Sequence, residues 1–96
     1  MRPLPFATET GTIASSSIAS NGRTSTTVTF TANRFTSAPV VTTGYYTTTA
    51  NNAASGLTTV QVQSITSTGC TVHRINGFTG GALAMEANWL ALQLEV

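Results

Sequence analysis

The chain has 96 residues, which is enough for one hydrophobic core and too few for a second domain. Only 7% of its residues are charged, against about 25% in an average protein, and it contains neither lysine nor aspartate. The net charge is +1, from three glutamates against four arginines, with a single histidine. So few titratable groups exclude most enzyme active sites, and the scattered arginines form no basic stripe for nucleic acid. We therefore expect a non-enzymatic module without cofactor, metal ion or nucleic-acid partner.

The amino terminus and the surface composition bear on location. Prolines at positions 3 and 5 interrupt the start, so it lacks the apolar run of a secretory signal. No stretch approaches the roughly 20 apolar residues of a membrane span. We expect synthesis in a host cytoplasm and no membrane partner. A surface with so little charge is poorly soluble as a free monomer, so we expect partners to cover much of it.

Residues 1–9 are expected to form an extended arm in front of a single β-sandwich domain at residues 10–96. The two prolines favour extended backbone, and between and after them stand Leu4 and Phe6. These two apolar side chains suit contact with a capsid or other partner protein. The alternative is a frayed terminus or the lead-in to the first strand.

Threonine and valine, which favour the pleated surface of a sheet, dominate the middle of the chain. Glycine and asparagine clusters separate the apolar and polar alternations, and strands are predicted at residues 10–19, 25–32, 40–49, 57–67 and 70–75. The period of two places Val28 and Phe30 on the core side of one strand, and Val60 and Val62 on the core side of another. The chain is therefore predicted to be all-β.

The last segment, residues 82–96, is ambiguous. Its composition favours a helix, with Leu83, Ala87, Leu90 and Leu94 on one face. As a strand it would place Trp89 and Ala91 toward the core. Its opposite side would then carry the aliphatic residues Leu90, Leu92, Leu94 and Val96. A strand that is apolar on both sides normally has both faces covered, so this face would need another subunit.

The order of these strands resembles the H-type lectin domain over about residues 25–94. The segments that carry the resemblance are Val28-Thr29-Phe30, Phe35, Ala38-Pro39-Val40-Val41, Val60 to Val62, Thr68-Gly69 and Trp89-Leu90-Ala91. The resemblance implies a six-stranded antiparallel β-sandwich that assembles as a homotrimer. It also implies that the last segment is a strand with Trp89 and Ala91 in the core, which leaves the aliphatic side for the trimer interface.

Sugar-binding members of this family use an acidic residue near the start, an arginine on the long middle strand, and a tryptophan-histidine pair on the next strand. This chain has Val60-Gln61-Val62 where the arginine is expected and no tryptophan before Trp89. His73 lies in the corresponding hairpin without its aromatic partner. These departures count against the family's own sugar site.

Three residues are candidates for ligand contact: His73, Arg74 and Arg34. His73 is otherwise a polar surface or subunit-interface residue, and the arginines otherwise form salt bridges to Glu86 or Glu95 at the rim. Cys70 stands three residues from His73, so on a strand the two side chains point to opposite faces. We expect Cys70 to be a small buried residue and not a nucleophile or metal ligand.

Lysine-free, threonine-rich trimeric β-modules of this kind resemble bacteriophage virion proteins. The first hypothesis is therefore a homotrimeric capsid decoration protein, exposed on the virion surface. The short chain favours it, because tail tips normally end a longer chain. The alternative is a receptor- or carbohydrate-binding module of a phage tail, or a free lectin that binds a cell-surface glycan.

Overall fold

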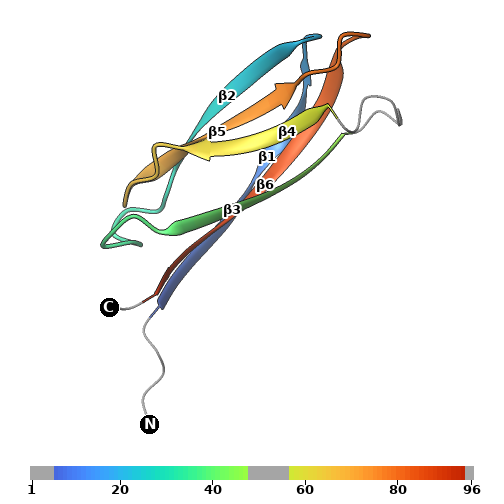
Figure 1. Ribbon diagram of the computed structural model, residues 1–96. Helices are drawn as coiled ribbons and strands as arrows, with labels where there is room; N and C mark the ends of the chain where they lie inside the picture. The colour runs from blue at the N-terminus through green and yellow to red at the C-terminus, as the bar shows by residue number, and fades with distance from the viewer. Residues whose placement is uncertain (1–5, 48–56, 95–96) are drawn as a thin grey trace.

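The computed structural model describes residues 6–47 and 57–94, and within them it contains six β-strands and no helix. The strands are β1 (Phe6–Ile18), β2 (Gly22–Thr29), β3 (Val40–Thr47), β4 (Thr58–Gln63), β5 (Gly69–Asn76) and β6 (Leu83–Leu94) (Figure 1). The first five overlap segments that the alternation of apolar and polar residues predicts as strands, and β6 lies in the segment that was ambiguous between helix and strand. The all-β class expected from the sequence is confirmed.

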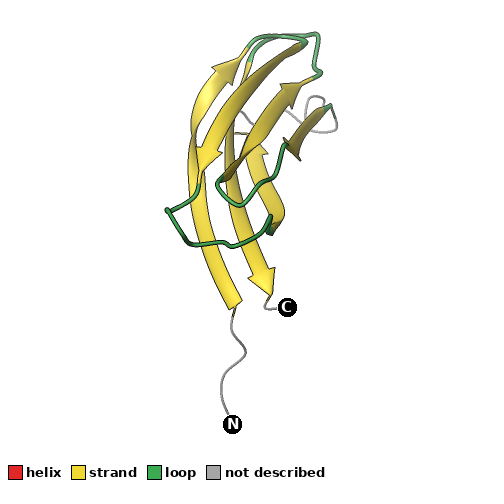
Figure 2. Ribbon diagram, turned by 90° about the vertical axis from the view of Figure 1, so that its left-hand side faces the viewer, coloured by secondary structure: helices red, strands yellow, loops and turns green. Residues whose placement is uncertain are grey.

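The strands form two three-stranded sheets, with strand orders β1-β6-β3 and β2-β5-β4. All four strand pairings are antiparallel. Figure 2 shows the two sheets as layers that lie face to face. The six-stranded antiparallel β-sandwich is therefore confirmed, and each sheet has one face toward the core and one face outward.

The last segment is a strand, although its residues favour a helix. β6 lies in the centre of its sheet and pairs with β1 on one side and β3 on the other. Met85, Ala87 and Ala91 on its inner side are completely buried. Helix propensities of ordinary residues differ by at most about 0.7 kcal/mol. Two hydrogen-bonded neighbours and a buried face outweigh such differences.

The hydrophobic core lies between the inner faces of the two sheets. Its buried members are Ile13, Val28, Phe30, Phe35, Val41, Cys70, Val72, Ala87, Trp89 and Ala91. Val60 and Val62 pack against this cluster and are partly buried. The ring of Phe30 lies 5.0 Å from that of Phe35 and 5.5 Å from that of Trp89, in the tilted and edge-on arrangements that aromatic pairs prefer.

Gly11 makes room for the tryptophan. It stands opposite Trp89 in the pairing of β1 with β6. A Cβ atom at Gly11 would lie 2.5 Å from Cζ2 of Trp89, which is far inside van der Waals contact. The absence of a side chain at this position lets the indole lie against the backbone of β1.

The first strand begins earlier than the sequence predicts. Residues 6–9, which were expected to belong to the arm, pair with residues 91–94 of β6. For these residues the structure shows the lead-in to the first strand, while Leu4 lies outside the described residues. The pairing shifts between Ile13 and Ser16, where a β-bulge interrupts the ladder.

A buried asparagine joins the loops at the end of the sandwich away from the termini (Figure 1). Nδ2 of Asn76 donates to the carbonyl oxygens of Ile18, Ala19 and Gly81, and Oδ1 accepts from the backbone N–H of Phe78. These bonds tie the β1–β2 turn to the β5–β6 loop.

The described residues include no helix that is long and apolar enough to span a membrane.

Candidate binding surfaces

The outer face of the β1-β6-β3 sheet carries a row of exposed aliphatic side chains near the chain termini. Leu90, Leu92 and Leu94 point outward from β6, because the residues between them point inward. Val40 stands beside Leu92 on the neighbouring strand β3. Val40 is 68% exposed, Leu94 65% and Leu90 41%. We call these four residues the leucine face; Val96, the remaining residue of the expected interface, lies outside the described residues.

Further along β6 the same face becomes polar. Asn88 is exposed between Thr12 of β1 and Gly44 of β3. Because Gly44 has no side chain, a shallow groove of about 410 Å³ opens here. Its lining residues include Thr10, Thr42 and Asn88. The apolar part of this face is thus confined to the end near the termini.

The outer face of the β2-β5-β4 sheet is polar and includes His73. Nδ1 of His73 lies 2.7 Å from the hydroxyl of Ser25 on β2, and Nε2 lies 2.9 Å from Oε1 of Gln63 on β4. An amide oxygen only accepts, so Nε2 carries a hydrogen, and Nδ1 of the neutral ring accepts from Ser25. Gln61 stands directly opposite His73 in the β4–β5 pairing. The middle strand therefore presents a glutamine beside the histidine, where family members that bind sugars have an arginine.

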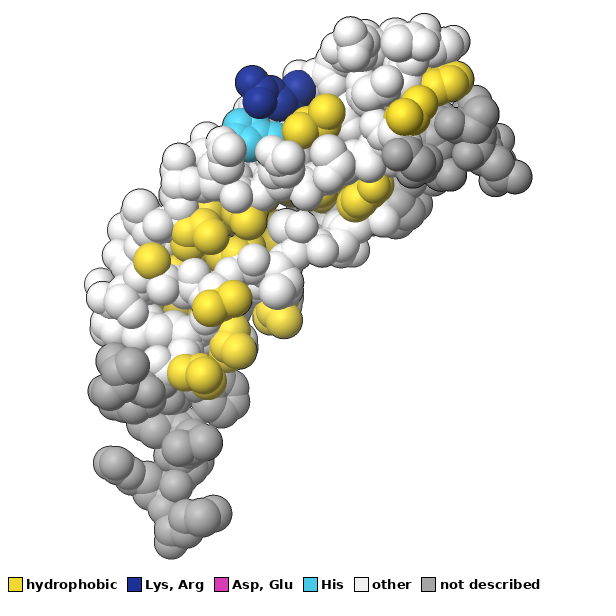
Figure 3. All heavy atoms as spheres, viewed as in Figure 1, with side chains coloured by type: hydrophobic (Ala, Val, Ile, Leu, Met, Phe, Trp, Pro, Cys, Tyr) yellow, Lys and Arg dark blue, Asp and Glu magenta, His cyan; other side chains and the backbone are white. Residues whose placement is uncertain are grey.

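Arg23 adds a positive charge to this face. It is exposed on β2 and pairs with Ile75, two residues beyond His73 on β5. Diagonal neighbours on antiparallel strands lie within reach of long side chains. Figure 3 shows an arginine and the histidine side by side on this face of the molecule. We call Arg23, Ser25, Gln61, Gln63 and His73 the polar face.

Sequence reasoning missed Ser25, Gln63 and Arg23 as neighbours of His73. The alternation along each strand already placed them on outward positions. Which of them lie beside the histidine depends on the strand register, which no local pattern specifies.

Arg74 is a correction to the sequence-based expectation of a ligand contact or a rim salt bridge. It is only 3% exposed and lies on the inner side of β5. Its Nη1 donates to the carbonyl oxygens of Ala14 at 3.0 Å and Met85 at 2.8 Å. Both carbonyls flank the β-bulge, where the β1–β6 ladder is interrupted. Arg74 of one sheet thus satisfies carbonyl groups of the other.

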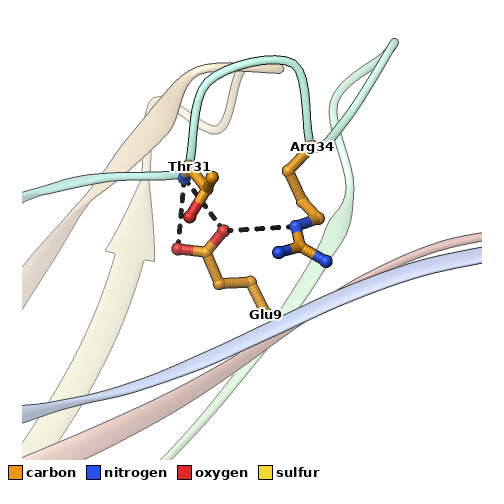
Figure 4. A network of polar contacts seen from close by, with 3 residues as sticks. All are labelled: Glu9, Thr31 and Arg34. Carbon is orange, nitrogen blue, oxygen red and sulfur yellow. Dashed lines mark hydrogen bonds and ion pairs between the residues drawn. The ribbon is translucent and has the colours of Figure 1, made fainter.

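Arg34 is exposed, and its acidic partner differs from the two that were expected. Its Nε lies 3.9 Å from Oε1 of Glu9, with side-chain exposures of 46% and 18%. The same carboxylate accepts two contacts from the backbone N–H of Thr31, at 2.9 and 3.2 Å (Figure 4). Glu9 therefore anchors the loop between β2 and β3, and Arg34 flanks that anchor. An exposed ion pair of this length contributes little to stability.

Cys70 and His73 lie on opposite sides of β5, as their spacing predicts. Cys70 is 3% exposed, and burial raises the pKa of its thiol. The described residues contain no group of three or more His, Cys, Asp or Glu side chains that could hold a metal ion. Phe6 begins β1 opposite Leu94, so its expected role in contacting a partner stays a prediction, as it does for Leu4.

The comparisons with known proteins point to one family. The sequence model of the H-type lectin domain matches residues 25–92. Curated protein sequences include no match to this chain.

Among solved structures, the chain is similar to an N-truncated R1-type pyocin tail fibre, with a TM-score of 0.61, 16% identity, and coverage of 92% of this chain and 69% of that one. It is also similar to a P. aeruginosa R1 pyocin fibre fragment, with a TM-score of 0.60 and 17% identity over 92% of this chain and 22% of that one. A third similar structure is the tailspike protein of Pseudomonas phage LKA1, with a TM-score of 0.60 and 20% identity over 97% of this chain and 15% of that one. The chain thus spans less than a quarter of the second and third structures.

Proposed function

The chain belongs to the H-type lectin domain family, and from that premise we propose that it is a non-enzymatic homotrimeric module of a phage or phage-like tail that attaches to a receptor on the target cell. The similar solved structures are tail fibres and a tailspike, which supports a tail more than a capsid. The fold and the polar face both suit binding, while the described part of the chain offers no group of three or more His, Cys, Asp or Glu side chains that could hold a metal ion.

The leucine face is the observation that supports the proposed trimer. Three leucines project from the central strand of the sheet, at the end of that face near the chain termini. Burying one leucine side chain stabilises an assembly by about 1.5–3 kcal/mol relative to leaving it in water. Every copy contributes the same residues, so association of three copies around a threefold axis would bury the leucine face of each copy.

Attachment needs a second surface that remains exposed in the assembly. The polar face lies on the outer side of the other sheet, so the leucine face and the polar face are separated by the whole thickness of the sandwich. One sheet can therefore assemble while the other contacts a receptor.

The capsid decoration hypothesis uses the same leucine face differently. The exposed aliphatic residues, with Leu4 and Phe6 of the amino-terminal segment, would pack on a capsid shell. Gold-labelled antibody against the chain, applied to intact particles, separates the two proposals. Label on the tail supports the tail module, and label on the capsid overturns it in favour of decoration.

The proposed function is tested by sedimentation equilibrium followed by binding of the fluorescent protein to a panel of bacterial strains. We expect a mass of three chains at micromolar concentration and saturable binding to at least one strain. A stable monomer would contradict the trimer. A trimer that binds none of the strains that the particle infects or kills would contradict the receptor role.

A further inference from the structure

We infer that the polar face binds an anionic saccharide, with Arg23 contacting the anionic group. This inference rests on the proposed function, because it names the chemistry of the receptor. It differs from the sugar site expected for the family, whose arginine and tryptophan have no counterpart in this chain.

The charges of the described residues are distributed unequally between the two sheets. The acids Glu9 and Glu86 both belong to strands of the β1-β6-β3 sheet. The strands β2, β4 and β5 contain no acidic residue, and their outward charges are Arg23 and His73. Figure 3 shows no acidic side chain among the described residues visible on this face. A negatively charged ligand would meet no repulsion here.

Ser25 and Gln63 hold the ring of His73 in place on this face. Nδ1 lies 2.7 Å from the hydroxyl of Ser25, and Nε2 lies 2.9 Å from Oε1 of Gln63. The groups that face the ring from β2 and β4 are hydroxyls and amides, and Arg23 is the one charged side chain among them.

The surroundings favour hydrogen bonding over stacking. None of the strands β2, β4 and β5 contains a phenylalanine, tyrosine or tryptophan, the large rings that stack against the apolar side of a sugar. Hydroxyls and amides are abundant instead. A shallow groove of about 260 Å³ lies further along β2 and β5, lined by residues that include Thr27, Thr29, Thr68 and Thr71. Affinity on such a face has to come from charge and polar contacts.

The anionic group can be a carboxylate or a phosphate, since the guanidinium binds both in a forked geometry. The trimer is immobilised at pH 6 and exposed to polygalacturonate, to phosphomannan and to neutral dextran, with binding measured by interferometry. We expect binding to one or both of the first two probes, at least about tenfold tighter than to dextran. Equal binding to dextran would overturn the inference.

Two arginine variants separate a specific contact from net charge. Arg23→Gln is expected to weaken binding to the acidic polysaccharide about tenfold, the usual worth of a charge-assisted hydrogen bond. Arg34→Gln removes the same charge beside Glu9, away from the polar face, and is expected to weaken it less than twofold. Equal losses in the two variants would overturn a contact at Arg23.

Competition on cells distinguishes failure of this inference from failure of the proposed function. If the protein binds cells and an excess of the acidic polysaccharide displaces it, both stand. If the protein binds cells but acidic polysaccharide does not displace it, the receptor role stands and the anionic ligand is wrong. If the trimer binds neither cells nor any of the three polysaccharides, both are wrong.

Discussion

The two outer faces of the sandwich are both built from three antiparallel strands, yet one is partly aliphatic and the other polar. The central strand β6 of one sheet presents Leu90, Leu92 and Leu94 to the outside. The central strand β5 of the other sheet presents Thr71, His73 and Ile75. Both strands are buried on the inner side, so the shared core does not account for the difference.

The comparison shows that the exposed aliphatic residues of the strands are confined to one of the two sheets. An antiparallel sheet with one face on the core normally has a polar face toward water. The β2-β5-β4 sheet follows this pattern, whereas the β1-β6-β3 sheet departs from it only at the leucine face. An exposed aliphatic patch rimmed by polar residues is typical of an interaction site.

Leu92→Glu is expected to convert the trimer into monomers. Leu92 lies beside Val40 in the middle of the leucine face, and three new charges would have to be buried in each trimer. Each trimer also loses the burial of three leucines, at about 1.5–3 kcal/mol per side chain. Sedimentation equilibrium should show a mass that falls to 9.9 kDa, that of a single chain.

The matched control for Leu92→Glu is Thr59→Glu, which adds the same charge at an exposed position of β4 on the other sheet. The control is expected to leave the mass unchanged. If Thr59→Glu dissociates the assembly and Leu92→Glu does not, then the two faces have been assigned the wrong way round.

Arg74→Met tests the connection that holds the two sheets together beneath their outer faces. The variant removes the donor to the carbonyl oxygens of Ala14 and Met85, of which the bond to Met85 is buried and the bond to Ala14 part-buried. One unsatisfied buried group costs about 1–3 kcal/mol, so the loss of the donor to Met85 should lower the free energy of unfolding in urea by about that amount.

Arg23→Met provides the comparison for Arg74, because it removes an arginine from the outer face of the same sheet. An exposed substitution of this kind is expected to change stability by less than about 0.5 kcal/mol. Equal destabilisation by the two variants would show that the hydrogen bonds from Arg74 to the carbonyl groups at the bulge do not stabilise the fold.

Gly11→Ala tests the inner side of the sheet that carries the leucine face. The added Cβ would meet the indole of Trp89 at 2.5 Å, so the ring must move or the strands must separate. Overpacking of this kind typically costs about 1–3 kcal/mol. Trp89 is the only tryptophan, so its fluorescence should change in the folded variant.

Gly44→Ala is the control for Gly11→Ala, since it adds a methyl group on the outer side of the same sheet. There the nearest atom is Oδ1 of Asn88 at 3.0 Å, at the end of an exposed side chain that can turn away. We expect a smaller loss of stability and no change in fluorescence. A larger loss at Gly44 would contradict the role given to Gly11.

Much of the fold was readable from the sequence because the two outer faces follow from a period of two. The alternation correctly separated Cys70 from His73, and it also gave Arg74 the parity of the buried positions Cys70 and Val72. Because Arg74 is charged, it was expected at the exposed rim. Only the carbonyl groups at the bulge, which accept hydrogen bonds from it, explain why it is buried. A bulge is specified by the pairing of two distant segments, so no local pattern reveals it.

The contacts of the candidate site could not be predicted for the same reason. Ser25 and His73 are far apart in the chain and meet through the register of β2 with β5. The pairing of Glu9 with Arg34 depends on the path of the β2–β3 loop. The family resemblance, in contrast, gave the fold of the last segment, where helix propensity alone would have been misleading.

The smallest expected effect concerns the two sides of β5. Burial raises the pKa of the Cys70 thiol, so in the folded protein it stays protonated at neutral pH and is shielded from reagents. A thiol in the unfolded chain ionises near pH 8.5, before the folded one. Stability is therefore unaffected by this group below about pH 8.5 and declines as the pH rises further.

The reaction of Cys70 with a disulfide reagent at pH 7.5 should accordingly be as slow as the opening of the fold, and urea should accelerate it. The control moves the thiol to the outer side of the same strand by combining Cys70→Ala with Thr71→Cys, one residue away. There the reagent should react within the mixing time in the folded protein. Similar rates at the two positions would mean that β5 does not separate a dry inner side from a wet outer side, and the contrast between the faces of the sandwich would lose its basis.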